Sequence, residues 1–153
     1  MVVLHPLSPM LQPKSSTFRK MHKVKARGSK KMTLDFGHFG VHTTEPGVLA
    51  ATTVEALRRT LTRTLKRQGK VWIRVFPHRV VTAKPAEVRM GKGKGSPSHW
   101  VCDLKKGQIL FEVAGVRPQK ALEALATIMP KSPLKLKLIQ HRATASPPTT
   151  DHL

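Results

Sequence analysis

The chain has 153 residues, and its 28 Lys and Arg against 8 Asp and Glu give a formal net charge of +20. Self-repulsion of this size disfavours a free compact monomer, so we expect a polyanion as its partner. No stretch approaches the ~20 apolar residues of a membrane-spanning helix. The single cysteine, Cys102, excludes an internal disulfide and any zinc site built from several cysteines.

The first 31 residues divide into two segments by composition. Residues 1–9 are apolar and contain proline, and we expect a flexible extension. Residues 10–31, called the arm below, carry eight basic side chains and no acid. Such a segment is expected to be disordered alone and ordered on phosphates, the alternative being a solvated tail with no fixed partner. The basic residues are Lys14, Arg19, Lys20, Lys23, Lys25, Arg27, Lys30 and Lys31.

A strand and a helix are predicted next. Residues 34–41 alternate apolar with small or polar residues, as in a strand. Thr52 and Glu55 have capping-box spacing, and leucines at helical spacing predict a helix from about Thr53 to Gln68, stopped by Gly69. The other face of this helix lacks acidic partners apart from Glu55, so we assign it to RNA contact rather than to solvent. Its cations are Arg58, Arg59, Arg63, Lys66 and Arg67.

A strand over residues 71–76 ends at Pro77 and leads into a long basic loop, residues 78–99. Near the end of this loop glycine alternates with lysine. Glycine lets the backbone approach another surface closely, and the interleaved ammonium groups require that surface to be anionic. The residues of this Gly/Lys loop are Arg89, Met90, Gly91, Lys92, Gly93, Lys94 and Gly95.

The last third predicts two strands, residues 100–104 and 108–113, joined as a hairpin by residues 105–107. A second helix begins at Pro118 and is closed by Pro130. Its expected buried stripe is Ala121, Leu122, Leu125, Ile128 and Met129. Residues 134–138 alternate leucine and lysine, which predicts a strand with its apolar side inward, and residues 143–153 are expected to be loose.

This element order predicts one α+β domain over residues 32–142, with two helices packed on a mostly antiparallel sheet. Catalysis is not expected, because the eight acids are scattered along the chain. The Walker phosphate-binding pattern fails because Gly95, not Ser or Thr, follows Lys94. His38 and His42 do not have the spacing of metal ligands on a strand, so neither a metal nor a cofactor is expected. The chain is strongly basic but has no motif that reads a base sequence. Structured RNA, which is recognised by shape and charge, is therefore a better match than a specific DNA sequence.

Several motifs together give the chain a family likeness. It resembles the bacterial-type large-subunit ribosomal protein sixteen, whose archaeal and eukaryotic counterpart is the ribosomal protein ten-e family, over about residues 10–142. The motifs, in order, are MLQPK at 10–14, FRKMHK at 18–23, FGHFG at 36–40, WIRVFP at 72–77, KPAEVRMGKGKG at 84–95 and ILFEVAGV at 109–116.

The resemblance implies an α/β-hammerhead-type domain on large-subunit rRNA, between the central protuberance and the A-site side of the peptidyl-transferase region. It implies one copy per ribosome, neighbouring ribosomal proteins as partners, no membrane, proximity to A-site tRNA, and a role in late subunit assembly. Peptide-bond chemistry would belong to the RNA. The residues that match the family's basic arm are Lys14, Arg19, Lys20 and Lys23, and those that match its loop near A-site tRNA are Arg89, Lys92 and Lys94.

Three departures from the family pattern indicate a diverged lineage: Ser15-Ser16 in the arm, His78-Arg79-Val80 after the strand, and His99 before Trp100. Together with the terminal extensions they favour a mitochondrial ribosome, with a plastid or the bacterial cytoplasm as alternatives. The alternative function is a free-standing RNA-binding or RNA-modifying protein, or a regulatory nucleic-acid-binding protein.

Overall fold

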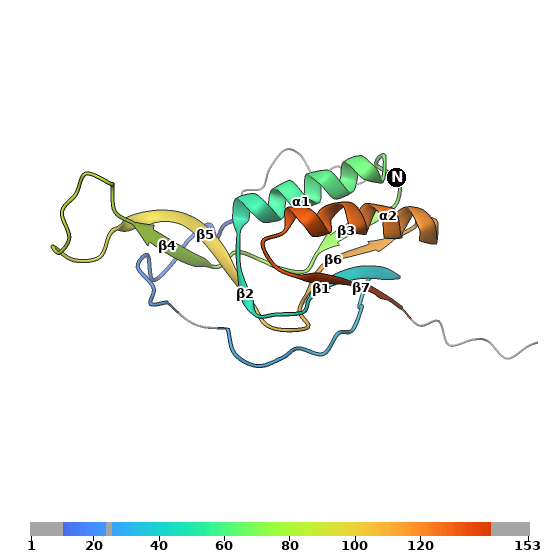
Figure 1. Ribbon diagram of the computed structural model, residues 1–153, viewed down its shortest axis with the longest axis horizontal. Helices are drawn as coiled ribbons and strands as arrows, with labels where there is room; N and C mark the ends of the chain where they lie inside the picture. The colour runs from blue at the N-terminus through green and yellow to red at the C-terminus, as the bar shows by residue number, and fades with distance from the viewer. Residues whose placement is uncertain (1–10, 24–25, 142–153) are drawn as a thin grey trace, which may run out of the picture.

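The computed structural model describes residues 11–23 and 26–141 (Figure 1). The expected extension at residues 1–9, the expected tail at 143–153 and Lys25 lie outside the described residues. The described part contains two helices and two antiparallel sheets, so the predicted α+β class is confirmed. The larger sheet has the order β3 (Lys70–Ile73), β6 (Ile109–Ala114), β1 (Phe39–Thr43) and β7 (Leu136–Gln140). The smaller sheet has the order β2 (Gly47–Ala50), β5 (Ser96–Leu104) and β4 (Arg79–Ala83).

Helix α1 (Ala51–Thr64) buries the predicted leucine stripe. Val54, Leu57 and Leu61 are fully buried, and Leu65 continues the same line past the last helical residue. The predicted capping box does not form: the N-cap residue is Ala50, which has no capping side chain, and Glu55 binds arginines instead. The helix also ends four residues before the predicted Gln68, because Lys66 and Arg67 take left-handed backbone conformations.

Helix α2 (Pro118–Ile128) lies beside α1, and Figure 1 shows both helices on one side of the larger sheet. It is followed by a short 3₁₀ turn, η1 (Met129–Lys131), which contains the predicted stop at Pro130. Ala124 is buried in the stripe, whereas the predicted Leu122 is 38% exposed. The buried face of α2 is narrow because two of its four residues are alanines. Leu122 lies at the margin of this face, so its burial was wrongly predicted.

Residues 105–107 do not join a hairpin, contrary to the prediction. Strand β5 pairs with β2 and β4, whereas β6 pairs with β1 and β3 in the other sheet. The connection is anchored to β1: the Gly107 amide donates to the Thr43 carbonyl at 2.8 Å, and the Thr43 amide donates to the Gln108 carbonyl at 3.1 Å. Residues 105–107 therefore lead the chain from β5 in the smaller sheet to β6 in the larger sheet.

The predicted long loop at residues 78–99 is largely a hairpin. Arg79–Ala83 forms β4, and β5 begins at Ser96, so the loop between these strands is residues 84–95. Val101 lies opposite both Ala50 of β2 and Arg79 of β4. Beyond that point β5 pairs with β4 alone, and Figure 1 shows this two-stranded ribbon extending away from the helices. The strands were missed because proline and basic residues break the apolar alternation in an element that has little core to bury.

The strand predicted at residues 34–41 is displaced: β1 starts at Phe39, and the preceding residues instead contact β6 and β3, where the Phe36 ring stacks on Trp72. The carboxylate of Glu112, which is fully buried, holds this segment by accepting the amides of Phe36 and Gly37 at 2.7 and 2.8 Å. Arg74 places Nη1 3.2 Å from Glu112 Oε1 and also pairs with Asp35. A buried acid therefore organises three backbone amides and one guanidinium, counting the longer contact from Asp35.

Strand β7 forms the edge beside β1, two residues later than predicted. Leu136 is buried, and Leu134 packs against the core from outside the strand. Leu138, by contrast, is 36% exposed. The expectation of a uniformly inward leucine face is therefore wrong at Leu138, because alternation specifies a face but not how far the core extends along an edge strand.

Candidate nucleic-acid interface

The arm and the Gly/Lys loop, far apart in the sequence, meet in the structure. The Lys20 ammonium donates to the carbonyl oxygen of Lys94 at 3.2 Å, and the Lys94 ammonium donates to the carbonyl oxygen of Met21. Both lysines are exposed. Since each ammonium has three donors, each retains donors that can face an anion.

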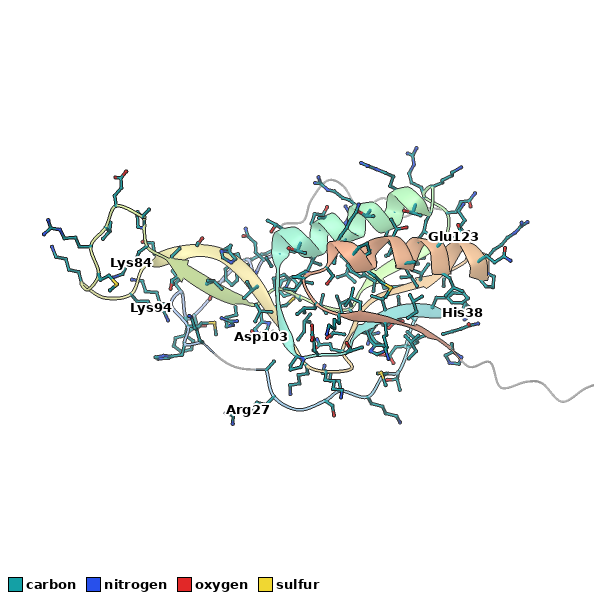
Figure 2. The ribbon with its side chains drawn as sticks, in the orientation of Figure 1. Arg27, His38, Lys84, Lys94, Asp103 and Glu123 are labelled. Atoms are coloured by element: carbon teal, nitrogen blue, oxygen red, sulfur yellow. The ribbon has the colours of Figure 1, made fainter. Side chains whose placement is uncertain are left out.

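A cleft of about 390 Å³ continues this contact along the β4–β5 ribbon. From the arm it is lined by residues 13–16 and Arg19, and from the ribbon by Val80 and residues 97–100. Every described basic residue of the arm is exposed, namely Lys14, Arg19, Lys20, Lys23, Arg27, Lys30 and Lys31. The first part of the arm, with Lys14 and Arg19, therefore lies against the ribbon, whereas Figure 2 shows Arg27 further along the arm, below the domain.

The tip of the Gly/Lys loop exposes its backbone as well as its side chains. Gly91, Lys92 and Gly93 have positive φ angles of 95°, 52° and 83°. No atom lies within 4 Å of a Cβ built at Gly91 or Gly93, so the backbone faces open space. Met90 is 98% exposed, and Arg89 and Lys92 are exposed beside it. Such a tip can approach another surface closely, which is the property predicted from the glycines.

Gly95 has a different role from the two tip glycines. A Cβ on Gly95 would lie 2.4 Å from the carbonyl oxygen of Ala83. Glycine is therefore required at this position because the two strands of the ribbon close here. The Gly/Lys loop thus combines an open tip with a tightly packed base, where Lys84 also donates to the Gly91 carbonyl.

The predicted cationic face of α1 divides into two parts. Arg58 binds Glu55 through Nε at 2.8 Å and Nη2 at 2.7 Å, and Arg59 Nε binds the same carboxylate at 3.0 Å. The Arg58 hydrogen bonds lower the pKa of Glu55 and raise that of Arg58. The expectation that this face lacks pairing partners is therefore wrong for Arg58 and Arg59. Arg63, Lys66 and Arg67 have no acidic partner among the described residues.

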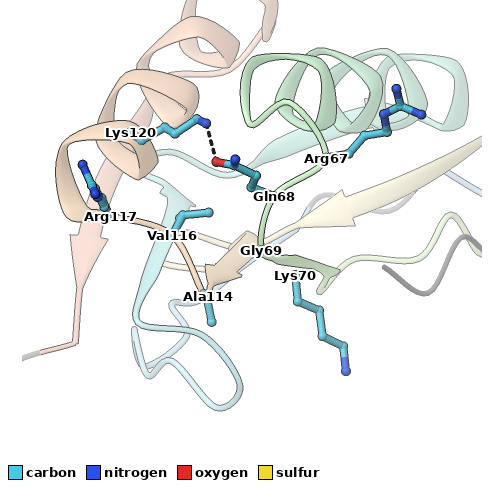
Figure 3. A pocket seen from close by; sticks show the side chains of 9 residues that line it. Arg67, Gln68, Gly69, Lys70, Ala114, Val116, Arg117 and Lys120 are labelled. Atoms are coloured by element: carbon cyan, nitrogen blue, oxygen red, sulfur yellow. Dashed lines mark hydrogen bonds between the residues drawn. The ribbon is translucent and has the colours of Figure 1, made fainter. Parts of the chain in front are cut away.

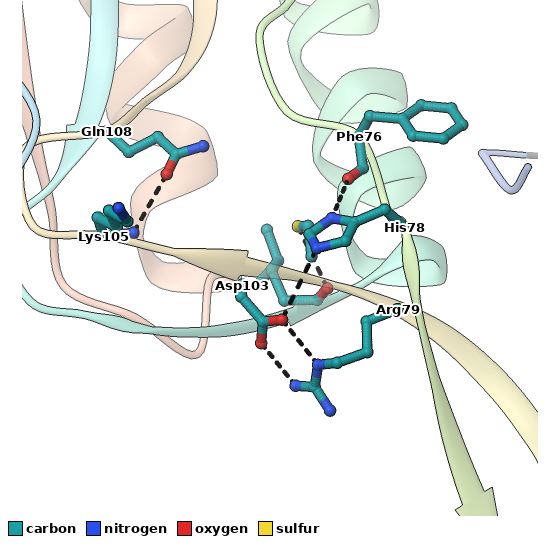
Figure 4. A network of polar contacts seen from close by, with 8 residues as sticks. Phe76, His78, Arg79, Asp103, Lys105 and Gln108 are labelled. Atoms are coloured by element: carbon teal, nitrogen blue, oxygen red, sulfur yellow. Dashed lines mark hydrogen bonds and ion pairs between the residues drawn. The ribbon is translucent and has the colours of Figure 1, made fainter. Parts of the chain in front are cut away.

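The base of the ribbon is held by a polar network (Figure 4). Arg79, which is 7% exposed, binds Asp103 through Nε at 2.7 Å and Nη2 at 2.5 Å. Hydrogen bonding to Asp103 raises the pKa of Arg79. His78 places Nε2 3.9 Å from the same carboxylate. The His78-Arg79 departure from the family pattern therefore has its own local partner, and the pair fixes where the ribbon leaves the domain.

Sequence reasoning missed a second cationic group at the other end of the molecule. Lys70, Arg117 and Lys120 join Arg67 around a groove between the end of α1 and the start of α2 (Figure 3). These residues come from separate segments, so no single run of charge identifies them. The available signal was the absence of acids between Val113 and Glu123, a stretch read only as helix start and core.

The described residues show no group of three or more side chains of the kinds that hold a metal ion. None of their helices is long and apolar enough to cross a membrane. Cys102 is buried, its Sγ lies 3.4 Å from the Leu49 carbonyl, and burial raises the pKa of its thiol to about 11. Cys102 is therefore a core residue, as predicted.

These features define a small, strongly basic α+β protein whose cations gather on an arm, a hairpin tip and a groove. Residues 13–139 match the family described as ribosomal protein L16p/L10e. The chain belongs to this family, and it is therefore a ribosomal protein with a structural rather than an enzymatic role.

Similar proteins come from bacteria and from eukaryotes. The chain is 51% identical to large ribosomal subunit protein uL16 of Gluconacetobacter diazotrophicus over 132 residues, covering 85% of this chain and 96% of that protein. It is 51% identical to uL16c of Gracilaria tenuistipitata, covering 85% and 98%. It is 47% identical to uL16m of Prototheca wickerhamii over 134 residues, covering 86% and 99%.

Proposed function

We propose that this ribosomal protein is a constituent of the large subunit and binds large-subunit rRNA through the arm, the Gly/Lys loop and the unpaired cations of α1. The main observation in support is that the arm and the Gly/Lys loop meet, with a hydrogen bond between Lys20 and Lys94. The described part of the arm contains no acid, and the connection between β4 and β5, residues 84–95, contains only Glu87. The contacts that join the two segments are made to neutral carbonyls, so their positive charges are held close together without a counter-charge. An RNA backbone would supply that counter-charge.

The proposed location is near the central protuberance and the A-site side of the peptidyl-transferase region, where the loop tip lies close to A-site tRNA. This location follows the family resemblance, and the open backbone at Gly91 and Gly93 supports it, because close approach to a nucleic acid needs a tip without obstructing side chains. In this role the protein supports late subunit assembly and positions tRNA. The expected partners are rRNA, A-site tRNA and neighbouring ribosomal proteins, at one copy per ribosome.

We place this ribosome in the mitochondrion. The support is the set of departures from the family pattern, at Ser15-Ser16, at His78-Arg79-Val80 and at His99. The similar proteins named above have nearly equal identities, so identity alone favours no compartment. Fractionation of source cells into mitochondria, plastids and cytosol, followed by immunodetection of the chain, tests this placement; recovery with another compartment's ribosomes contradicts it.

Binding of the full chain to large-subunit rRNA fragments across a salt series tests the RNA contact. Each phosphate contact contributes about 0.7–0.9 to the slope of log affinity against log salt, so several contacts give a steep slope. Replacing Lys92 and Lys94 with alanine is expected to reduce the slope and to impair tRNA accommodation, without loss of the fold, because both side chains are exposed. A flat slope for the unmodified chain contradicts the proposal.

Sucrose-gradient sedimentation separates the structural role from the alternative, a free-standing RNA-binding or RNA-modifying protein. A structural constituent remains with the large subunit through a high-salt wash at close to one copy per particle. Recovery well below one copy, with the remainder at the top of the gradient, favours the alternative.

A further inference from the structure

The groove between α1 and α2 is formed where four elements end or begin. Helix α1 ends and β3 begins on one side, and β6 ends and α2 begins on the other. The groove has a volume of about 990 Å³, and Figure 3 shows it open between Arg67 and Arg117. Figure 1 places this end of the domain away from the β4–β5 ribbon. It is therefore a site separate from the arm and the Gly/Lys loop.

Two glycines lie next to each other in the lining of the groove. Gly69 and Gly115 have φ angles of 72° and 75°, and a Cβ on Gly115 would lie 3.4 Å from the Cα of Gly69. A Cβ on Gly69 would lie 2.5 Å from the Ala114 carbonyl oxygen and 2.6 Å from Val116 Cγ1. The two turns are therefore packed against each other as only glycine allows, and the space above them stays open.

The rim of the groove is cationic and has no carboxylate. Its charged residues are Arg67, Lys70, Arg117 and Lys120. Among the described residues none of the four forms an ion pair: Lys120 donates to Gln68 Oε1 at 2.6 Å, and Lys70 lies 5.0 Å from the centre of the Trp72 ring. Four like charges around one concavity repel one another, so the arrangement is stabilised when an anion enters.

Two backbone features add to this charge. Lys66 and Arg67 have φ angles of 51° and 62°, a conformation that is unfavourable for residues other than glycine and is common at functional sites. This turn places Arg67 next to Gln68 at the margin of the groove, and Figure 3 shows its side chain directed outward. The first turn of α2 contains no acid and no side-chain cap, so its free amides add positive potential at the same edge.

We propose that this groove binds a phosphodiester segment of large-subunit RNA, as a second contact at the opposite end of the domain from the Gly/Lys loop. The inference rests on the proposed rRNA binding and adds a site to it. A backbone contact fits better than a base contact, because the rim offers cationic donors and the lining offers no aromatic side chain. With both ends bound, the domain would bridge two RNA segments instead of lying on one.

The test compares two variants of the full chain that lose the same charge. The groove variant carries Arg117→Gln and Lys120→Gln, and the control carries Lys135→Gln and Lys137→Gln, at two exposed lysines beside and within edge strand β7. In rRNA binding across a salt series, the groove variant is expected to lower the slope by about one relative to the control. Equal slopes for the two variants overturn the groove site and leave the proposed function intact, whereas a flat slope for the unmodified chain overturns both.

A second measurement separates a phosphate site from a loss of stability. Titration with tripolyphosphate, followed by amide NMR, is expected to shift Gly69, Gly115 and Lys120 saturably in the unmodified chain and in the control, but not in the groove variant. A variant with Arg117→Lys and Lys120→Arg keeps the charge and is expected to restore both the shifts and the slope. No shift at these amides in the unmodified chain, or no restoration by the charge-preserving variant, overturns the proposal.

Discussion

The ammonium of Lys20 donates to the carbonyl oxygen of Lys94, 74 positions later in the chain. Lys94 returns the contact by donating to the carbonyl oxygen of Met21. Two residues of like charge therefore hold each other's segments through neutral carbonyls, which leaves their positive charge uncompensated. The arm and the Gly/Lys loop act as one cationic unit.

Replacing Lys94 with glutamine is expected to release the arm from the loop, because the contact to the Met21 carbonyl is lost. Exposed polar contacts contribute about 0.5–1 kcal/mol, so tryptic cleavage after Arg19 and Lys23 should accelerate a few-fold. Lys92→Gln removes the same charge from the same loop but no described contact to the arm. Equal cleavage rates for the two variants would contradict the coupling.

Asp103→Ala is expected to destabilise the protein by about 3–5 kcal/mol, because it leaves the buried Arg79 guanidinium without a counter-ion. Urea unfolding followed by circular dichroism measures the loss. The double variant Arg79→Met with Asp103→Leu should recover most of it, since no buried charge remains. Glu55→Gln, which breaks a more exposed pair, should cost about 1 kcal/mol or less; a loss at Asp103 no larger than at Glu55 would refute the anchoring role.

Glu112→Gln is expected to cost several kcal/mol, because an amide cannot accept from Phe36 and Gly37 and also balance Arg74. The segment over residues 34–38 should then detach from β6. Hydrogen exchange at the Phe36 and Gly37 amides reports this directly. Glu123→Gln, at an exposed position on α2, is the matched control and should leave both exchange rates unchanged.

Alkaline pH should destabilise the fold through Cys102. Burial raises the pKa of its thiol from about 9 to about 11, so the folded state keeps a proton that the unfolded state loses. The contribution is complete below pH 9 and is lost progressively as pH rises to about 11, by up to about 2–3 kcal/mol. Subtracting the unfolding free energies of Cys102→Val at each pH isolates this effect from lysine titration. A difference that stays constant from pH 8 to 11 would contradict it.

Much of the fold could be predicted because apolar periodicity reports burial. The leucines of α1, the core position of Cys102 and the α2 positions Ala121, Leu125 and Ile128 follow from the spacing of apolar residues, and the structure confirms them. The pairing of strands was less accessible. Residues 105–107 read as a hairpin turn because two strands flank them, and nothing local states that the strands enter different sheets.

Clusters of cations could be predicted where the basic residues are contiguous in the sequence, and not where folding brings them together. The arm and the Gly/Lys loop appear as runs in the sequence, whereas Arg67, Lys70, Arg117 and Lys120 come together only through folding. Pairing also escaped the sequence: Glu55 has the spacing of a cap, but two arginines one turn further along outcompete the backbone amide for its carboxylate. A backbone amide and an arginine bind a carboxylate with similar strength. Which of them Glu55 binds depends on side-chain geometry, which cannot be read from the sequence.

The arm is fastened twice along β5. Near the ribbon tip it is held at Lys20 and Met21, and near the turn after β5 the amide of Lys30 donates to the Lys106 carbonyl at 2.7 Å, beside a parallel bridge from Ser29. The arm therefore connects the tip of the projecting ribbon to the junction between the two sheets. A displacement of the tip would strain both attachments. The same segment of chain therefore contacts both the tip of the ribbon and the turn that joins the two sheets.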